Sequence, residues 1–139
     1  MTVRYLLDTN VLSEAIRPKP NPYVLQKLQI HQQEVGTATL VIHELLFGCY
    51  RLPISKKRET LKTYMEKVIL PNMPLFDYDL KSAEWHATER ARLGSMGQTP
   101  AFVDGQIAAI TYSNQLILVT NNVSDFDIFQ GLKIENWFQ

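Results

Sequence analysis

Short apolar runs alternate with amphipathic stretches along the whole chain. Runs with the length and composition of buried strands occur at residues 3–7, 34–37, 75–77, 115–120 and 132–135. Between them, apolar residues recur at helical spacing, which predicts helices at residues 11–16, 23–29, 40–50, 55–71, 80–93 and 100–113. Thr39 and Thr99 are expected to cap two of these helices, and residues 121–127 are expected to form a loop or short turn.

Strands separated by helices are typical of one parallel sheet covered by helices on both faces. We therefore expect an α/β fold, a small parallel-sheet α/β/α sandwich, in which residues 1–139 form a single domain. The pattern does not determine the order of the strands in the sheet.

The composition is that of an ordinary globular protein, with 45% hydrophobic and 20% charged residues. The 14 Lys and Arg residues balance the 14 Asp and Glu residues, so no overall positive field indicates a nucleic-acid partner, although an acidic site can mask basic residues elsewhere. The single cysteine, Cys49, allows no internal disulfide and suits a reducing compartment. Because neither a leader pattern nor an apolar run of membrane-spanning length is present, we expect a cytoplasmic protein without membrane contact.

Oxygen-bearing residues follow the first strand and the strand at residues 115–120. Asp8, Thr9 and Asn10 come directly after the first strand, and Thr120 and Asn122 stand at the end of the other. The carboxyl ends of parallel strands share one edge of a sheet, where ligands bind in open α/β folds, so we expect these side chains to meet. The structural alternatives are a helix cap at Asp8 and ordinary turn formers at Thr120 and Asn122.

Three further acids lie outside the strand ends. Glu44 shares its predicted helix face with Val41 and Leu45, and a carboxylate buried there would need a hydrogen-bond network, a cation or a metal. The alternative for Glu44 is a position at the rim, in contact with water. Asp104 stands in register with small apolar residues, although the helix dipole also favours a surface aspartate near a helix N-terminus. Asp125 either joins the cluster or is a solvated loop acid.

Clustered carboxylates suit a hard divalent cation. Mg²⁺ binds only a few carboxylate oxygens and keeps several waters, and Asp8, Glu44 and Asp104 could supply those oxygens. Such a site can activate water and bind the oxygens of a phosphodiester during an in-line displacement. Without a metal, the three carboxylates would repel one another and raise at least one pKa.

Several other catalytic and metal-binding patterns do not fit. His43 and Glu44 begin like the zinc-protease motif HExxH, but Phe47 occupies the position of the second histidine. The three histidines lack metal-ligand spacing, and Cys49 has no partner for zinc. The chain contains neither a GxSxG nucleophile elbow nor a Walker loop.

Four segments resemble, in order, the successive motifs of PIN domains, and most closely those of VapC-type toxins from bacterial type II toxin–antitoxin modules. They are residues 7–13 (LDTNVLS), 42–48 (IHELLFG), 103–109 (VDGQIAA) and 119–126 (VTNNVSDF). The ending at residues 131–137 (GLKIENW) is similar to the terminal segment of that family. Each motif alone is unspecific, but the ordered set is specific and spans essentially the whole chain.

The resemblance implies a Mg²⁺- or Mn²⁺-dependent endoribonuclease. Carried over by position, Asp8 and Asp104 would be the principal metal ligands, and Glu44 would complete the acidic site directly or through water. The polar lining would consist of Thr9, Asn10 and Thr120. Many PIN domains carry a fourth acid where this chain has Asn122, and Asp125 could partly replace it. We therefore expect one firmly held metal.

The resemblance also implies partners: an RNA substrate, a homodimer, and a cognate VapB-type antitoxin that wraps around the toxin and blocks its site in a hetero-oligomer. An apolar stripe either serves such an interface or packs on the protein's own core; it consists of Leu61, Tyr64, Met65, Val68 and Ile69. Candidate contacts to RNA phosphates, which are otherwise a solvated charged face, are Lys56, Lys57, Arg58, Arg90 and Arg92.

The main alternative is a catalytically silent PIN domain that acts as a binding or scaffold module. The retention of Asp8, Glu44 and Asp104 disfavours it. A hydrolase with Asp8 as a phosphoryl-accepting nucleophile would need an acid two residues later, where Asn10 stands. A flap-type DNA nuclease would need additional length. The sequence pattern does not indicate which RNA is cut.

Overall fold

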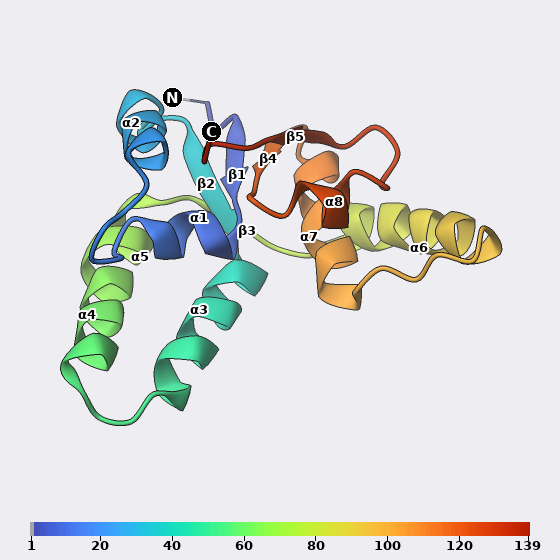
Figure 1. Ribbon diagram of the computed structural model, residues 1–139. Coiled ribbons are helices and arrows are strands. Elements are labelled where there is room, and N and C mark those ends of the chain that lie inside the picture. Colours follow the sequence, from blue (N-terminus) through green and yellow to red (C-terminus); the bar gives the residue numbers. More distant parts are fainter. Residues whose placement is uncertain (1) are drawn as a thin grey trace.

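A five-stranded parallel sheet organises the protein (Figure 1). The computed structural model describes residues 2–139. The strands are β1 (Tyr5–Leu7), β2 (Val35–Ala38), β3 (Leu75–Phe76), β4 (Ile117–Val119) and β5 (Lys133–Glu135). They lie in the order β3-β2-β1-β4-β5, and every neighbouring pair is parallel. The predicted fold class is therefore confirmed.

Helices connect successive strands, as parallel pairing requires. They are α1 (Thr9–Glu14), α2 (Pro22–Ile30), α3 (Thr39–Arg51), α4 (Lys56–Tyr64), the π-helical segment η1 (Met65–Ile69), α5 (Leu70–Asn72), α6 (Leu80–Ser95), α7 (Phe102–Ser113) and α8 (Val123–Phe126). In Figure 1, α3 and α4 extend together away from the sheet, while α6 and α7 pack against each other on the other side of the molecule. No helix within residues 2–139 is both long enough and apolar enough to span a membrane.

The two central strands, β1 and β4, position the polar residues that follow them. Leu6, Leu7, Leu118 and Val119 are completely buried, which is typical of parallel strands covered on both faces. Leu7 pairs with Val119, and the backbone N–H of Asp8 donates to the carbonyl of Val119 at 3.0 Å. This register brings the residues that follow β1 and β4 to the same edge of the sheet.

Two predicted helix caps are wrong. Helix α3 begins at Thr39 itself, after Ala38, and has no side-chain cap. Helix α7 begins at Phe102 because Ala101 is still extended, with ψ of 137°, so Thr99 does not cap it. The Phe102 ring packs against His86, with 4.9 Å between ring centroids. This contact lies at the point where the chain turns into the helix.

The structure also changes the limits of three other predicted elements. The strand predicted at residues 115–120 starts only at Ile117, because Gln115 has a positive φ of 58° and ends the preceding helix. The predicted loop at residues 121–127 contains the short helix α8. The predicted helix 55–71 is continuous but includes the π-helical segment η1. Met65 and Ile69 of its apolar stripe are buried in the protein's own core, whereas Val68 is exposed.

Candidate active site

Asp8 lies at the carboxyl end of β1 and is held by three hydrogen bonds. Its Oδ1 accepts the backbone N–H of Thr9 at 2.8 Å, and its Oδ2 accepts the Thr120 hydroxyl at 2.8 Å and the Asn10 amide at 3.2 Å. The residue is only 6% exposed, and burial raises the pKa of its carboxyl although these hydrogen bonds oppose the rise. None of the ion pairs formed within residues 2–139 involves Asp8. The carboxylate is therefore buried among neutral donors.

The predicted polar lining forms one network around Asp8. The Asn10 amide nitrogen also donates to the Thr120 hydroxyl at 3.3 Å, and its oxygen accepts the backbone N–H of Asn121 at 3.0 Å. The Thr120 hydroxyl accepts the backbone N–H of Asn122 at 3.0 Å, which directs its proton toward Asp8. The network thus links the residues after β1 with those after β4. Thr9 and Asn122 take part through their backbone N–H groups.

Asp104 lies in the first turn of α7 and faces the other acids. The pKa of its carboxyl is raised to about 6, first by burial and then by the charges of Asp125, Asp8 and Glu44. This effect of the other acids on the pKa of Asp104 agrees with a location of the four predicted acids in one region of the molecule. As for Asp8, no ion pair within the described chain neutralises Asp104.

Glu44 does not lie where its helix pattern placed it. We expected a position on the core face of its helix, but the residue is exposed, whereas its neighbours Val41 and Leu45 are buried. The physical reason is that α3 extends away from the sheet, so only part of its circumference meets the core (Figure 1). Glu44 instead contributes charge at the rim, where it raises the pKa of both Asp8 and Asp104.

Asp125 also lies at the rim, in the first turn of α8. It is exposed, and its charge is the second-largest cause of the raised pKa of Asp104. The side chain of Asn122 is exposed as well and forms the cap of α8 without a side-chain hydrogen bond. The positions agree with a role for Asp125 as the fourth acid, which stays a prediction.

The donor set fits a hard divalent cation that keeps several of its waters. The four residues offer carboxylate oxygens, which Mg²⁺ and Mn²⁺ prefer, and neither the buried Asp8 nor the half-buried Asp104 forms an ion pair within residues 2–139. Within residues 2–139, no three Asp, Glu, His or Cys side chains are close enough together to bind one ion simultaneously. The geometry is therefore suited to binding through few direct ligands, with water completing the shell.

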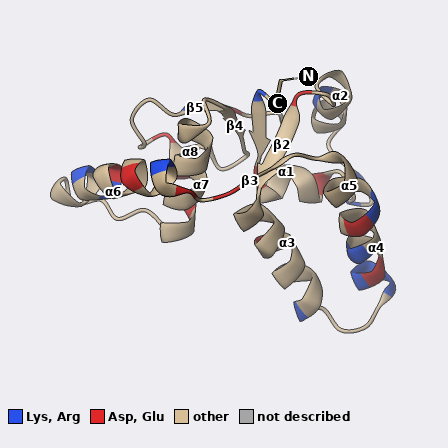
Figure 2. Ribbon diagram, turned by 180° about the vertical axis from the view of Figure 1, so that it is seen from behind, with Lys and Arg blue, Asp and Glu red and all other residues tan. Residues whose placement is uncertain are grey.

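The five candidate phosphate-binding residues differ in their surroundings. Figure 2 shows both signs of charge interspersed on α4 and α6, the helices that carry all five residues. Arg92 is bonded to Glu89 and to the carbonyl of Ile128, and Arg90 lies over the ring of Phe102 at 5.0 Å. Arg58 donates to the carbonyl of Leu52. By contrast, Lys56 and Lys57 line a cavity of about 750 Å³.

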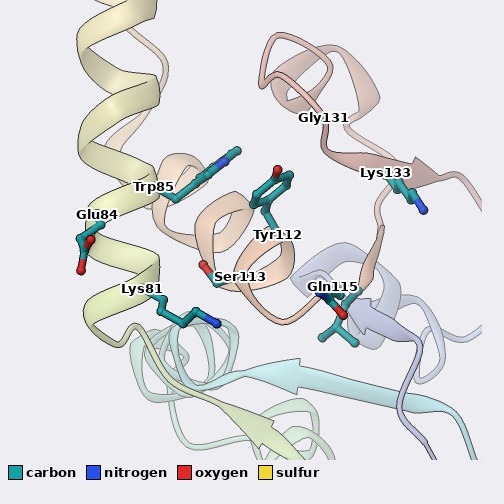
Figure 3. A pocket seen from close by; sticks show the side chains of 9 residues that line it. Lys81, Glu84, Trp85, Tyr112, Ser113, Gln115, Gly131 and Lys133 are labelled. Carbon is teal, nitrogen blue, oxygen red and sulfur yellow. The ribbon is translucent and has the colours of Figure 1, made fainter.

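A separate cavity, which none of the four candidate acids lines, lies between α6, α7 and β5 (Figure 3). It measures about 520 Å³ and includes residues at the start of β4 and β5, at the amino edge of the sheet. Trp85 and Tyr112 stack in it with 4.8 Å between ring centroids, while Glu84 points away from it. The Ser113 hydroxyl is the one buried side-chain polar atom without a hydrogen-bond partner among residues 2–139.

Sequence reasoning missed two buried acids, Glu14 and Glu89. Both are almost fully buried, at 6% and 5% exposure, and each forms an ion pair with an arginine three residues later. The i to i+3 spacing of acid and arginine was the available signal. It did not stand out because such spacing is usually found on exposed helix faces.

The fold and the polar carboxyl edge define the class of this protein. Residues 5–129 match the PIN domain family, and the chain belongs to that family. The resemblance inferred from the four ordered segments is thereby confirmed.

Similar proteins include named toxins and ribonucleases. The chain is 32% identical over 124 residues to toxin FitB of Neisseria gonorrhoeae, covering 87% of this chain and 89% of FitB. It is 26% identical over 136 residues to the tRNA(fMet)-specific endonuclease VapC of Shigella flexneri, covering 97% of this chain and 98% of that protein. Among solved structures, DNA-bound VapBC from Salmonella typhimurium matches with a TM-score of 0.84 and 27% identity, covering 97% of this chain and 98% of that one.

Proposed function

We propose that this protein is a divalent-metal-dependent endoribonuclease that acts as the toxin of a type II toxin–antitoxin module. The observation that supports the chemistry is the pair Asp8 and Asp104, two carboxyls with raised pKa at the carboxyl edge of a PIN-domain sheet and without a protein cation. Similarity to toxin FitB and to an endonuclease VapC supports the substrate class and the biological role.

Asp8 and Asp104 would hold Mg²⁺ or Mn²⁺, with Glu44 and Asp125 acting directly or through its waters. The bound ion would activate water and neutralise the charge that develops on the phosphodiester oxygens. Thr120 and Asn10 keep the Asp8 carboxylate in one orientation through their hydrogen bonds to its Oδ2. With a pKa of about 6, Asp104 is mostly ionised at neutral pH and can bind a cation there.

The partners follow from the same similarity. VapBC from Salmonella typhimurium was solved bound to DNA, which supports a cognate VapB-type antitoxin for this chain. The resemblance to VapC-type toxins adds a homodimer to the proposal. Because the proposed substrate is cellular RNA, the proposed compartment is the cytoplasm.

RNA cleavage by the purified protein tests the proposal. Total RNA is incubated with Mg²⁺, with Mn²⁺ or with chelator, using the wild type, Asp8→Asn and Asp104→Asn. Both substitutions keep the side-chain shape and remove a charge. A matched control is Glu84→Gln on α6, which makes the same change at an exposed position that points away from the cavity of Figure 3.

The proposal predicts metal-dependent cleavage by the wild type and by Glu84→Gln, with loss of cleavage in both folded aspartate variants. Cleavage that persists in both variants would indicate a contaminating nuclease and remove support for the site. A folded wild type that cleaves no RNA with either metal would favour a catalytically silent binding module.

A further inference from the structure

Glu14 on α1 is a buried acid that the proposed metal site does not use. It is 6% exposed, and both of its oxygens are occupied. Its Oε2 accepts the backbone N–H of Asn21 at 2.8 Å, and its Oε1 accepts Nη1 of Arg17 at 3.0 Å. A buried carboxylate is costly unless it is paired and hydrogen-bonded. The structure therefore uses Glu14 to hold Arg17.

Arg17 itself faces solvent. Its side chain is 67% exposed, whereas that of Glu14 is 7% exposed. Of the five N–H donors of the guanidinium, Glu14 accepts one, through Nη1. The other donors of Arg17 make no hydrogen bond within residues 2–139, and the bond to the buried Glu14 carboxylate restrains the guanidinium. A guanidinium held in this way loses little conformational freedom when it binds a second group.

The position of Arg17 links it to the acidic site. It lines a cavity of about 370 Å³ together with Asn10 and Asn121, which belong to the hydrogen-bond network around Asp8. The cavity thus begins beside Asp8 and reaches Arg17. Arg17 also lines the adjoining cavity of about 750 Å³ that contains Lys56 and Lys57.

The polar and charged side chains along these two cavities suit a nucleic-acid strand, while Ile16, Pro18 and Leu61 give the larger cavity a mainly apolar wall. Glu14 is the one acid that lines them, and its charge is neutralised by Arg17. Lys56 and Lys57 add uncompensated positive charge along the path. The Arg17 guanidinium, although paired with Glu14, keeps further N–H donors, and guanidinium groups bind phosphate through parallel N–H donors. Amide side chains suit the sugar and base of a nucleotide.

We propose that Arg17 binds a phosphate of single-stranded RNA next to the site of cleavage, with Glu14 as its positioning residue. The RNA strand then continues along α1 toward Lys56 and Lys57 at the start of α4. This inference rests on the proposed nuclease function and adds to it a residue that holds the substrate and the direction in which the RNA leaves the acidic site.

Binding of a fluorescently labelled single-stranded RNA, measured by anisotropy at several salt concentrations without divalent ions, tests this role. Arg17→Ala is expected to lower affinity about tenfold and to reduce the slope of log K against log salt by about 0.7, the contribution of one phosphate contact. Arg17→Lys is expected to restore the slope but only part of the affinity, because the ammonium lacks the planar fork. Glu14→Gln is expected to keep the slope and to weaken binding several-fold.

Arg4→Ala is the matched control, because Arg4 is also an exposed arginine in an ion pair, at 3.1 Å from Glu34, but lies before β1 at the opposite edge of the sheet. It is expected to bind RNA like the wild type. In cleavage assays, Arg17→Ala is expected to raise KM about tenfold with little change in kcat, as for an interaction made equally in ground and transition states.

Equal affinity and equal salt slope for Arg17→Ala and the wild type would overturn the inference while leaving the nuclease function intact. An effect of Arg17→Ala confined to the complex with the antitoxin would also overturn it, because the surface would then bind protein. A wild type that neither binds nor cleaves RNA would overturn the proposed function itself, and the two failures are therefore distinguishable.

Discussion

Asp8 and Glu89 are buried to the same extent but have opposite electrostatic environments. Glu89 on α6 is 5% exposed and Asp8 is 6% exposed. Glu89 accepts Nε and Nη2 of Arg92 at 2.8 and 2.9 Å and the backbone N–H of Gln130 at 2.7 Å. The hydrogen bond from Arg92 lowers the pKa of Glu89, whereas burial among neutral donors raises the pKa of Asp8. Two differences separate the acids: Glu89 has a cation beside it and Asp8 has none, and burial acts more strongly on the pKa of Asp8 than on that of Glu89.

The difference indicates what each acid is for. Arg92 also donates to the carbonyl of Ile128 at 3.0 Å, so the pair fastens α6 to the segment that precedes β5. A carboxylate neutralised within the chain stabilises the fold and has little left to offer a ligand. Asp8 and Asp104 lack such a partner, which leaves their charge available for a cation from solution.

The same chemical change at the two regions should therefore have different consequences. Asp8→Asn or Asp104→Asn is expected to slow RNA cleavage by about 100-fold or more, since a catalytic metal supplies several kcal/mol of transition-state stabilisation. Stability without metal should not fall in Asp104→Asn, because the substitution removes a charge that burial disfavours. Asp8→Asn also replaces an oxygen that accepts hydrogen bonds from Thr120 and Asn10, so this variant should lose some stability but still fold. Single-turnover cleavage together with urea unfolding of each variant measures both quantities. Loss of structure in both variants would mean that these acids have a structural role like that of Glu89.

Glu89→Gln is expected to show the reverse behaviour. Losing the charge leaves Arg92 without its counter-ion and weakens the acceptor of the Gln130 N–H, so the free energy of unfolding should fall by about 2 kcal/mol. Cleavage per folded molecule should stay at the wild-type level. Urea unfolding monitored by tryptophan fluorescence gives the first value, and cleavage in the absence of urea gives the second. A large loss of cleavage activity in the fully folded Glu89→Gln variant would contradict a purely structural role for Glu89.

Gly105 connects the two regions, because it follows Asp104 on α7 and faces His86 on α6. A Cβ at this position would collide with Nε2 and Cδ2 of His86, whose Nδ1 is hydrogen-bonded to the Tyr78 hydroxyl at 2.9 Å. Gly105→Ala must therefore either displace the buried His86 ring, at the expense of its hydrogen bond to Tyr78, or move α7 away from α6, at a cost of about 1–3 kcal/mol. The accompanying shift of Asp104 should slow cleavage about tenfold. Thermal unfolding and cleavage of Gly105→Ala test this, and an unchanged melting temperature would exclude the predicted collision.

The smallest expected effect is on the pH dependence of stability in the absence of metal. The folded-state pKa of Asp104 is about 6 and its ordinary value is 3.8, so between these values the folded state binds a proton that the unfolded state has lost. Its contribution to stability therefore decreases as pH rises from about 4 to about 6 and is constant above that range. Solvent screening of this partly exposed group keeps the change near or below about 1 kcal/mol. Urea unfolding of the wild type and Asp104→Asn across this range should show the decrease only in the wild type.

Local sequence signals predicted that Asp8 and Thr120 would meet, because strand ends are local features. Asp8 and Thr120 each follow a buried strand, and the parallel register then brings them within hydrogen-bond distance. The sequence left the position of Glu44 open between the core and the rim, since the outcome depends on how far α3 extends beyond the sheet. The hydrogen-bond partners of Glu89 could not be predicted from the local sequence, because one of them is the backbone N–H of Gln130, 41 residues later in the chain.

The most direct test of the account is isothermal titration calorimetry with Mn²⁺ at neutral pH, without RNA. It measures the binding of the metal itself, independently of catalysis, for the wild type, Asp8→Asn, Asp104→Asn and the control Glu89→Gln. The account predicts one ion per chain in the wild type and in Glu89→Gln, with binding lost or strongly weakened in both aspartate variants. Unchanged stoichiometry and affinity in Asp8→Asn and Asp104→Asn would contradict the assignment of the metal to the carboxyl edge of the sheet.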